Sequence, residues 1–496
     1  MNSQVFKNPF LYSHQTLIVN TRAIGYDSVE SVYHKGGDCV SQVNDIYGSV
    51  EIPEGVLWGA NTQRSLQNFP IGVEKMPREL IEALIHIKRA AAQANGEKGV
   101  LDRPIADAII EASDQILEQE LYDQFPLAIW QTGSGTQTNM NANEVIANLA
   151  NKNHPGLVVH PNDHVNKGQS SNCVFPTALH VCLTLMINRD LIPAIEAMRD
   201  ELDQLAEKHQ DVLKTGRTHL QDATPVTFGQ EAAAWAHCYR QCLSQLEATL
   251  PMLRKLTIGG TAVGTGLNAY RGFGADVSRY LNENLGEQFE STENPFHGMS
   301  AKDAIVFMHG ALTAIAADTM KVANDIRWLA SGPRCGIGEL TIPANEAGSS
   351  IMPGKVNPTQ AEAITMVCVQ VMANHQAVVM GASQGNFQLN VYMPMILHNA
   401  WQSIRLLTDG LNSFRERCVQ GIEVNRDKMR ENLEKSLMTA TYLNNRFGYD
   451  QTARIVKEAH ERGLRIKDVI VEHQLMTADE FDAFFDYKAM IKPYEL

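Results

Sequence analysis

Apolar side chains recur at helical spacing through most of this chain. After residue 75 they return every three or four positions, which predicts one helix after another. We expect Pro193 to kink the helix that contains it, because proline removes a backbone donor. The helices are expected near residues 78–98, 104–121, 136–151, 174–210, 225–256, 302–331, 358–382 and 393–418.

The longest of these helices indicate the fold class. They far exceed the mean helix length of about 11–12 residues, and residues 361–379 are apolar nearly all round. A helix without a polar face is buried on every side. The sequence therefore predicts a mostly α fold with a long-helix central bundle whose outer faces are covered by other subunits. The alternative is one large monomeric bundle.

Changes in composition suggest the domain boundaries. We expect a disordered N-terminal extension at residues 1–45, an N-terminal domain at 46–168, the central bundle domain at 169–423 and a small C-terminal domain at 424–496. Basic residues are sparse in the extension, which favours a cytoplasmic protein over a mitochondrial-matrix protein with a presequence. Polar residues interrupt the most apolar stretch, so we expect no membrane span.

Charge and cysteine usage exclude some classes of partner. The formal net charge is −14, which argues against nucleic acid and anionic membranes. A dianionic ligand would therefore need a site with its own local positive potential. None of the eight cysteines forms a C-x-x-C pair, which is typical of a reducing compartment.

Candidate chemistry lies in four short segments that precede predicted helices. Each is rich in Gly, Ser, Thr or Asn: Gly133–Asn139, Gly168–Asn172, Gly216–Asp222 and Gly348–Pro358. Free N–H groups and the helix dipole make a helix start an anion site. Ordinary capping is the alternative for any one segment, but capping does not require a lysine, a histidine and paired serines in the same segments.

The fourth segment has the most specific pattern. Asn357 followed by Pro358 predicts an N-cap and a first helical residue, and Gln360 would complete a capping box. Lys355 would then lie beside a helix N-terminus, where a carboxylate finds both a full charge and a dipole. Thr224 and Pro225 are expected to begin a helix after the third segment in the same way.

These segments also carry a family resemblance. Ser349-Ser-Ile-Met-Pro-Gly-Lys-Val-Asn-Pro358 resembles the signature of the fumarase/aspartase superfamily. Gly332–Gly338, Gly385–Phe387, His160–Asp163 and Leu57–Gly59 are similar to class II fumarate hydratases, and the similarity covers about residues 46–490. His219 and Gly354 favour the fumarases over the aspartate ammonia-lyases, which carry Gln and Ala there.

The resemblance implies reversible addition of water to fumarate, giving (S)-malate, without a metal or other cofactor. It gives His219 the role of acid and base for water, with Glu362 as its carboxylate partner. It makes Ser349 the group that exchanges the C3 proton. A free serine is a poor base, so this role requires an anion-stabilising pocket. The family fold also implies a homotetramer whose active sites are each shared between three subunits.

Further residues would bind the substrate carboxylates. They are Ser134, Gly135, Thr136, Ser170, Ser171, Asn172, Thr218, Ser350, Lys355, Val356 and Asn357. His160, Pro161, Asn162 and Asp163 match a second anion site of the family. The same four residues are equally typical of an ordinary turn.

Some positions depart from the family pattern. Cys173 replaces a usual Asp after Asn172, which removes a favourable helix-dipole contact of about 0.3–1 kcal/mol. Gly168, Gln388 and Asn294–His297 also differ, but none of the departures removes a proposed catalytic group. Two rival hypotheses remain: an ammonia-lyase acting on aspartate, and a catalytically silent protein on the same fold.

Overall fold

The computed structural model describes residues 28–35, 38–45 and 47–493. This part of the chain is mostly helical, which confirms the predicted fold class. It divides into two compact units. The first consists of the described residues up to Thr184, of Pro251–Val306 and of Ala377–Trp401. The second consists of Leu185–Leu250, Phe307–Gln376 and the described residues from Gln402 onward.

The first unit contains the N-terminal sheet and most of the shorter helices. Its elements are β1 (Ser28–Lys35), β2 (Asp38–Asp45), β3 (Gly48–Pro53), α1 (Ala60–Asn68), α2 (Arg78–Glu97), α3 (Arg103–Glu118), η1 (Tyr122–Gln124), α4 (Thr136–Asn153), η2 (Pro161–Val165), β6 (Lys255–Leu256), α9 (Phe273–Leu285), β7 (Glu290–Ser291) and α10 (Pro295–Ser300). Five helices have residues in both units: α5 (Ser171–Met186), α8 (Leu250–Leu253), α11 (Asp303–Leu329), α12 (Thr359–Ala382) and α13 (Met393–Arg417).

The second unit contains a β-hairpin and the C-terminal helices. Its elements are η3 (Ile187–Leu191), α6 (Ile192–Lys208), β4 (Leu213–Thr218), β5 (Gln221–Thr227), α7 (Phe228–Glu247), β8 (Leu340–Thr341), η4 (Val419–Gly421), β9 (Glu423–Val424), α14 (Arg426–Lys435), η5 (Leu437–Leu443), α15 (Asn444–Arg462), α16 (Ile466–Glu472), α17 (Ala478–Phe484) and η6 (Tyr487–Ile491).

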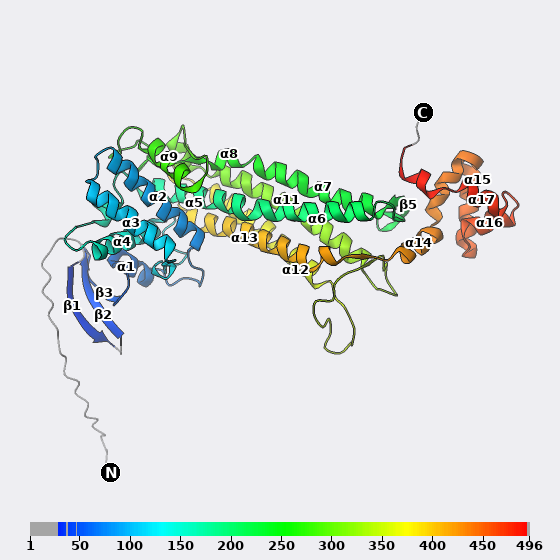
Figure 1. The fold of residues 1–496 in the computed structure, drawn as a ribbon, viewed down its shortest axis with the longest axis horizontal. Helices are drawn as coiled ribbons and strands as arrows, with labels where there is room; N and C mark the ends of the chain where they lie inside the picture. Colours follow the sequence, from blue (N-terminus) through cyan, green and yellow to red (C-terminus); the bar gives the residue numbers. More distant parts are fainter. Residues whose placement is uncertain (1–27, 36–37, 46, 494–496) are drawn as a thin grey trace, which may run out of the picture. The chain divides into compact units, whose positions relative to one another are not determined.

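The sheet of the first unit corrects one expectation. Strands β1, β2 and β3 pair antiparallel in that order, beside α1 (Figure 1). Val43 of β2 packs with Val50 and Ile52 of β3 and with Ala60 of α1 in a small core. Residues 28–35 and 38–45 of the predicted disordered extension therefore form strands, because β2 contributes to this core. Residues 1–27 of that extension lie outside the described residues.

Helix α1 has its N-terminus capped by a carboxylate from another helix. Glu144 of α4 is 1% exposed and accepts hydrogen bonds from the backbone N–H groups of Gly59 (2.9 Å), Asn61 (2.9 Å) and Thr62 (3.2 Å). The Thr62 hydroxyl donates a further bond of 2.6 Å. A charge at the positive end of the dipole thus satisfies groups that α1 cannot pair by itself.

We expect Glu144→Gln to lower the thermal melting temperature. The glutamine places an NH₂ donor where the carboxylate accepted bonds from other donors, so at least one buried donor loses its partner. Such a loss lowers the free energy of unfolding by about 1–3 kcal/mol. Glu118→Gln, at the exposed end of α3, is the matched control and should melt like the wild type. Equal melting temperatures for both variants, measured by circular dichroism, would contradict the capping role.

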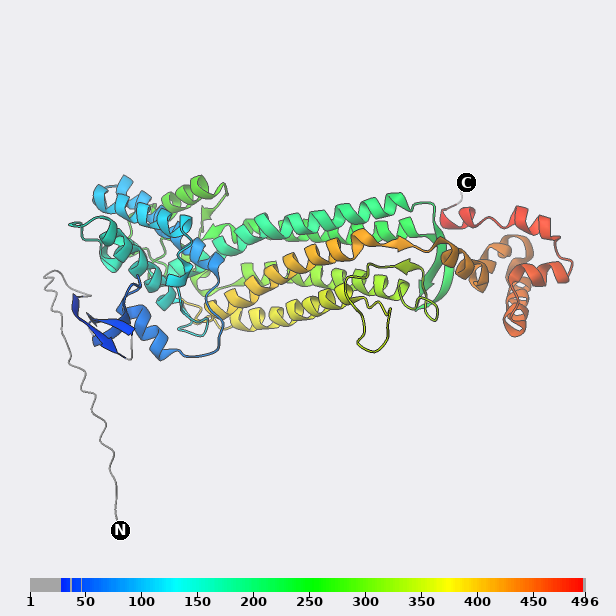
Figure 2. The same cartoon turned by 60° about the horizontal axis from the view of Figure 1, so that its bottom comes forward.

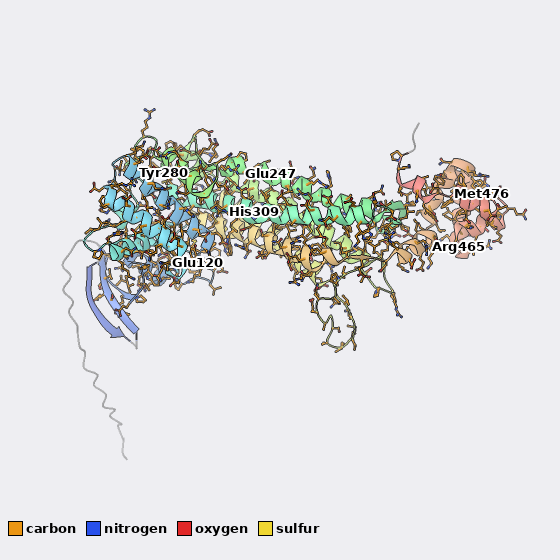
Figure 3. The ribbon with its side chains drawn as sticks, viewed as in Figure 1. Glu120, Glu247, Tyr280, His309, Arg465 and Met476 are labelled. Atoms are coloured by element: carbon orange, nitrogen blue, oxygen red, sulfur yellow. The ribbon has the colours of Figure 1, made fainter. Side chains whose placement is uncertain are left out.

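Packing in the second unit centres on long helices. Helices α6 and α7 run side by side, both in green in Figure 2. Trp235 and Tyr239 of α7 are fully buried and donate hydrogen bonds to Asp325 (3.0 Å) and Thr319 (3.3 Å) of α11. The C-terminal helices form a separate core that includes Met476, labelled in Figure 3.

Most helix predictions are confirmed within three residues at either end, including those for α2, α3, α4, α11, α12 and α13. The helix expected near 225–256 begins only at Phe228, because β5 occupies Gln221–Thr227. Its expected end was wrong, since α7 stops at Glu247 and a separate short helix, α8, covers Leu250–Leu253. Thr227 caps α7 through a capping box with Gln230. Pro193 lies at the start of α6, directly after the π-helical turn η3, where its missing N–H is accommodated.

Three helical stretches among the described residues have the length and hydropathy of membrane spans, by length and composition alone, where none was expected from the sequence. They are Ser171–Lys208, Asp303–Leu329 and Thr359–Ala382. The polar residues inside the last stretch do not lower its mean hydropathy enough to exclude it. Its most apolar window is only 28% buried, against 72% for the first stretch. Helix α12 therefore exposes apolar surface that the single chain does not cover.

Candidate active site

The N-terminus of α4 presents small polar groups in a fixed geometry. Gly135, the N-cap, has a φ of 72°, and a Cβ at this position would lie 2.1 Å from the Phe175 ring. Only glycine fits there. The hydroxyls of Ser134 and Thr136 lie 2.9 Å apart and share a hydrogen bond. The predicted donors of this segment thus gather at one helix start.

The N-terminus of α5 lies against that of α4. Asn139 of α4 donates a 3.0 Å hydrogen bond to the Ser171 hydroxyl. The Ser170 hydroxyl accepts from the Asn172 backbone N–H at 3.2 Å, and the Asn172 side chain donates to the Ala262 carbonyl at 2.9 Å. One hydrogen of the Asn172 amide is therefore used within the chain. The structure brings Ser134–Thr136 and Ser170–Asn172 together within the first unit.

His219 lies on a β-hairpin and not before a helix, which corrects the prediction for its segment. Strands β4 and β5 pair Thr218 with Gln221, which leaves His219 and Leu220 as a two-residue turn. Both have a φ of 58°, as in the hairpin turns that require positive φ. The side chain of His219 is exposed. Left-handed backbone at non-glycine residues is costly and concentrates at functional sites.

A buried ion network holds the base of this hairpin. Glu339 is fully buried and accepts two hydrogen bonds from Arg217, at 2.6 and 3.0 Å, and one from Asn432 at 3.1 Å. Lys214 lies 3.4 Å from the same carboxylate and 3.0 Å from Glu231. These cations hold the pKa of Glu339 below its ordinary value although burial opposes the shift. A bidentate anchor two residues before His219 fixes where the turn lies.

The Gly348–Pro358 segment is a loop folded onto itself. Asn357 donates its side-chain N–H to the Gly348 carbonyl. A Cβ at Gly348 would lie 2.1 Å from the Lys355 carbonyl oxygen, so glycine is required at that close approach. Helix α12 begins at Thr359. Asn357 therefore closes the loop and does not act as the expected N-cap.

The capping box predicted for this helix is also absent. Gln360 accepts a 2.8 Å hydrogen bond from Ser413 of α13 instead of binding back to Asn357. Lys355, Val356 and Asn357 line a hollow of about 730 Å³ together with Arg327 and Ser331. Lys355 is exposed and provides a positive charge at this hollow.

Ser349 sits where two backbone donors converge. Its hydroxyl oxygen accepts hydrogen bonds from the N–H groups of Ile351 (3.2 Å) and Met352 (3.0 Å). Donors aimed at an oxygen stabilise negative charge on it. The role expected for this serine requires an anion-stabilising environment. These two N–H groups would provide part of that environment. Ser350 is exposed on the same loop.

His219 and Glu362 both lie in the second unit and are both exposed. Among the described residues no hydrogen bond joins their side chains. Thr218 is exposed next to His219. The geometry within one chain thus leaves the proposed His219–Glu362 pair unformed.

The predicted second anion site forms a tight turn. His160 accepts hydrogen bonds from the N–H groups of Asn162 (3.3 Å) and Asp163 (3.0 Å), and its ring lies 3.3 Å from the Asp163 carboxylate. Pro161 begins the short helix η2. The backbone donors of this turn are therefore used internally, which supports the turn alternative.

Two buried charged residues beside the candidate segments, one in each unit, were missed from the sequence. Nothing in the sequence indicated that Glu339 is buried, because the residue follows a glycine-rich loop without hydrophobic periodicity. Lys88 did carry a sign of burial: it continues the buried face of α2 formed by Ile81, Leu84 and Ile85 at helical spacing. A charged residue on an otherwise apolar helix face is the pattern that could have revealed it.

Family models match most of the chain. A model described as "Lyase" matches residues 48–373, and one described as "Fumarase C C-terminus" matches residues 440–492. The chain belongs to this lyase family.

Similar sequences and a similar solved structure indicate which member of the lyase family the chain is. The chain is 49% identical over 453 residues to "Fumarate hydratase class II" of Bacillus subtilis (strain 168), covering 90% of this chain and 98% of that protein. It is 53% identical over 443 residues to the protein of the same name from Myxococcus xanthus (strain DK1622), with 88% and 95% covered. The crystal structure of class II fumarase from Schistosoma mansoni superposes with a TM-score of 0.88 at 37% identity, covering 92% of this chain and 100% of that one.

Within the lyase family the chain is therefore a class II fumarate hydratase, a hydro-lyase that interconverts fumarate and malate in the tricarboxylic acid cycle. This outcome confirms the resemblance noted from Ser349–Pro358 and sets aside both the ammonia-lyase and the silent-scaffold hypotheses.

Proposed function

We propose that His219 and Ser349 perform the hydration from opposite faces of the fumarate double bond. Water adds its oxygen to C2 while one of its protons passes to the His219 imidazole. C3 takes a proton from the Ser349 hydroxyl. In the reverse direction Ser349 removes the C3 proton of malate, and His219 protonates the departing hydroxyl. The observation that carries this proposal is the pair of N–H groups that converge on the Ser349 oxygen.

The carboxylates of the substrate require fixed donors. Removal of the C3 proton spreads charge into the neighbouring carboxylate, so groups that bind this carboxylate stabilise the transition state. We assign this role to Lys355 and Asn357, with Val356 and Ser350 on the same loop. The remaining donors are Ser134, Gly135, Thr136, Ser170, Ser171, Asn172 and Thr218. The hydroxyls of Ser134 and Thr136, 2.9 Å apart at one helix start, support their part in this assignment.

We also propose that the enzyme is a homotetramer with shared active sites. Helix α12 exposes Met366 (68%), Val369 (58%) and Met380 (67%), which is an unusual amount of apolar surface for a single helix. Contact with other subunits would bury it and would account for the span-like hydropathy of α12. It would also allow Glu362 of one subunit to meet His219 of another, a pair that the single chain leaves open.

Mixed oligomers test the shared site. Alone, His219→Asn should have a low kcat and Asn172→Ala a high KM, so both should be slow at low malate concentration. Co-expression of the two, with different affinity tags, should restore part of the wild-type activity, because some sites then combine an intact His219 with an intact Asn172 from another subunit. Two differently tagged copies of His219→Asn are the control and should restore nothing. Purified mixed oligomers without activity would contradict a site shared in this way.

Three further assignments complete the proposal. His160, Pro161, Asn162 and Asp163 remain a candidate second anion site, with the ordinary turn as the better supported alternative. Residues 424–496 form a separate C-terminal domain, which the independent core around Met476 supports. The enzyme acts in the cytoplasm, consistent with its bacterial relatives, and a mitochondrial location is the alternative if residues 1–45 act as a presequence.

A further inference from the structure

Lys88 is a fully buried cation beneath the turn that begins α5. It lies on α2 with 0% exposure. Its Nζ donates hydrogen bonds of 2.9 Å to the side-chain oxygens of Asn166 and Gln169. Gln169 directly precedes Ser170, so the lysine contacts the segment that leads into the proposed substrate donors.

The contacts of Lys88 extend to those donors. Asn139 donates to the same Asn166 oxygen at 3.3 Å and to the Ser171 hydroxyl at 3.0 Å. Asn166 in turn donates to the Gln169 carbonyl at 3.2 Å. One ammonium group therefore anchors two amides that set the path of the chain into Ser170 and Ser171.

Cys173 of α5 is a thiol that acts electrostatically on this ammonium. Cys173 is fully buried, and its Sγ donates to the Ser170 carbonyl at 3.3 Å. Among the described residues it is the one titratable group that acts electrostatically on Lys88. A neutral thiol leaves the buried charge without a counter-charge, and burial lowers the pKa of Lys88 to about 7. Burial likewise raises the pKa of Cys173, which keeps the thiol neutral.

Carboxylates on the helices that pack against α2 have partners other than Lys88. On α3, Asp114 pairs with Arg89. On α4, Glu144 caps α1. On α9, Asp276 pairs with Lys98 and Arg279. In η2, burial holds the pKa of His164 below its ordinary value.

We propose that Lys88 is a positioning residue for the Ser170–Asn172 turn, and that the two hydrogen bonds from its buried ammonium to Asn166 and Gln169 control how tightly the enzyme binds its dicarboxylate substrate. The charged form holds both amides firmly and adds a positive charge beneath a site for a dianion. The neutral form keeps the packing but loses the charge. This inference rests on the proposed substrate-binding role of the turn.

The sign of the pH dependence follows from the direction of the shift. Above neutral pH the charged fraction of Lys88 falls about tenfold per pH unit, and the apparent affinity falls with the competent fraction. KM should therefore rise by up to about tenfold per unit above pH 7, and kcat should change much less. The free energy of unfolding should instead increase with pH, while the affinity for substrate decreases. The folded state binds fewer protons than the unfolded state between the pKa of about 7 and the ordinary value of 10.5, so stability from this group rises across that window.

Cys173→Asp tests the proposal in the full-length enzyme. A carboxylate beside Lys88 should raise its pKa, so KM for malate should stay level from pH 6 to pH 9. At pH 6 the variant should match the wild type, and at pH 9 its KM should be at least about tenfold lower. Cys173→Ser, which is neutral, should keep the wild-type profile.

Two outcomes would distinguish a failure of the Lys88 inference from a failure of the proposed substrate-binding role of the Ser170–Asn172 turn. If Cys173→Asp and wild type share one KM profile while Asn172→Ala raises KM, the Lys88 inference is overturned and the site assignment stands. If Asn172→Ala leaves KM unchanged, the site assignment itself fails. Should Cys173→Asp not fold, Lys88→Met replaces it: its KM should be high and independent of pH, and a pH-dependent KM like that of the wild type would overturn the inference.

Discussion

Replacing His219 by asparagine should lower kcat for both malate and fumarate by about 10²–10⁴-fold, the usual contribution of a positioned acid–base group. The fold should survive the change. Position 219 has a φ of 58°, and asparagine tolerates this left-handed conformation better than histidine does. Steady-state rates and circular dichroism together measure the two effects.

The neighbouring position provides the control for this variant. Leu220 has the same φ and is also exposed. Leu220→Asn makes the same change of backbone preference without removing an imidazole, so its rates should equal those of the wild type. A wild-type kcat in His219→Asn would refute the assigned role of the histidine. A large loss in Leu220→Asn would mean that the turn, and not the imidazole, limits the rate.

Replacing Ser349 by alanine should lower kcat by about 10²–10⁴-fold as well, because the C3 proton then has no acceptor. The Ile351 and Met352 N–H groups lose the oxygen they point at, but the loop keeps its Asn357 closure. KM should change less than kcat, since Lys355 and Asn357 are intact. Initial rates with malate at several concentrations separate the two constants.

Hydrogen exchange distinguishes Ser349 from His219. Incubation of malate in deuterium oxide, followed by NMR, measures exchange at C3 without net turnover. His219→Asn should retain this exchange, because Ser349 can still remove the proton while the hydroxyl stays in place. Ser349→Ala should lose it. Undiminished exchange in Ser349→Ala would assign the proton to another group.

The helical architecture could be predicted from the sequence because its signal is local. Apolar spacing placed α2, α11, α12 and α13 within three residues of their observed ends. The unusual apolarity of α12 also pointed to covering subunits from the sequence alone. These features depend on the spacing and number of apolar residues along one element, so no knowledge of distant contacts was needed.

The hairpin that carries His219 could not be predicted in the same way. Residues 213–227 contain Thr, Gly and Pro in an order that fits either a helix start or a strand pair. The choice depends on the anchor that Arg217 makes with the buried Glu339, which is 122 residues away. Long-range pairs of this kind decide local structure without leaving a local pattern.

The geometry of the loop at Gly348–Pro358 could not be predicted from the sequence, and the chemistry expected of it stays a prediction. Its lysine, serine and asparagine are residue types that a dicarboxylate site needs. The sequence nevertheless suggested an N-cap at Asn357, where the structure shows a side-chain bond across the loop to Gly348. The two backbone N–H groups directed at the Ser349 oxygen could not be predicted, because every residue type except proline carries a backbone N–H.

A direct assay with two substrates tests the central claim. The purified full-length protein is incubated separately with malate and with aspartate, and the appearance of fumarate is followed by its ultraviolet absorbance. We expect fumarate from malate and none from aspartate. Fumarate from aspartate alone, or from neither substrate with a well-folded protein, would contradict the assignment as a fumarate hydratase.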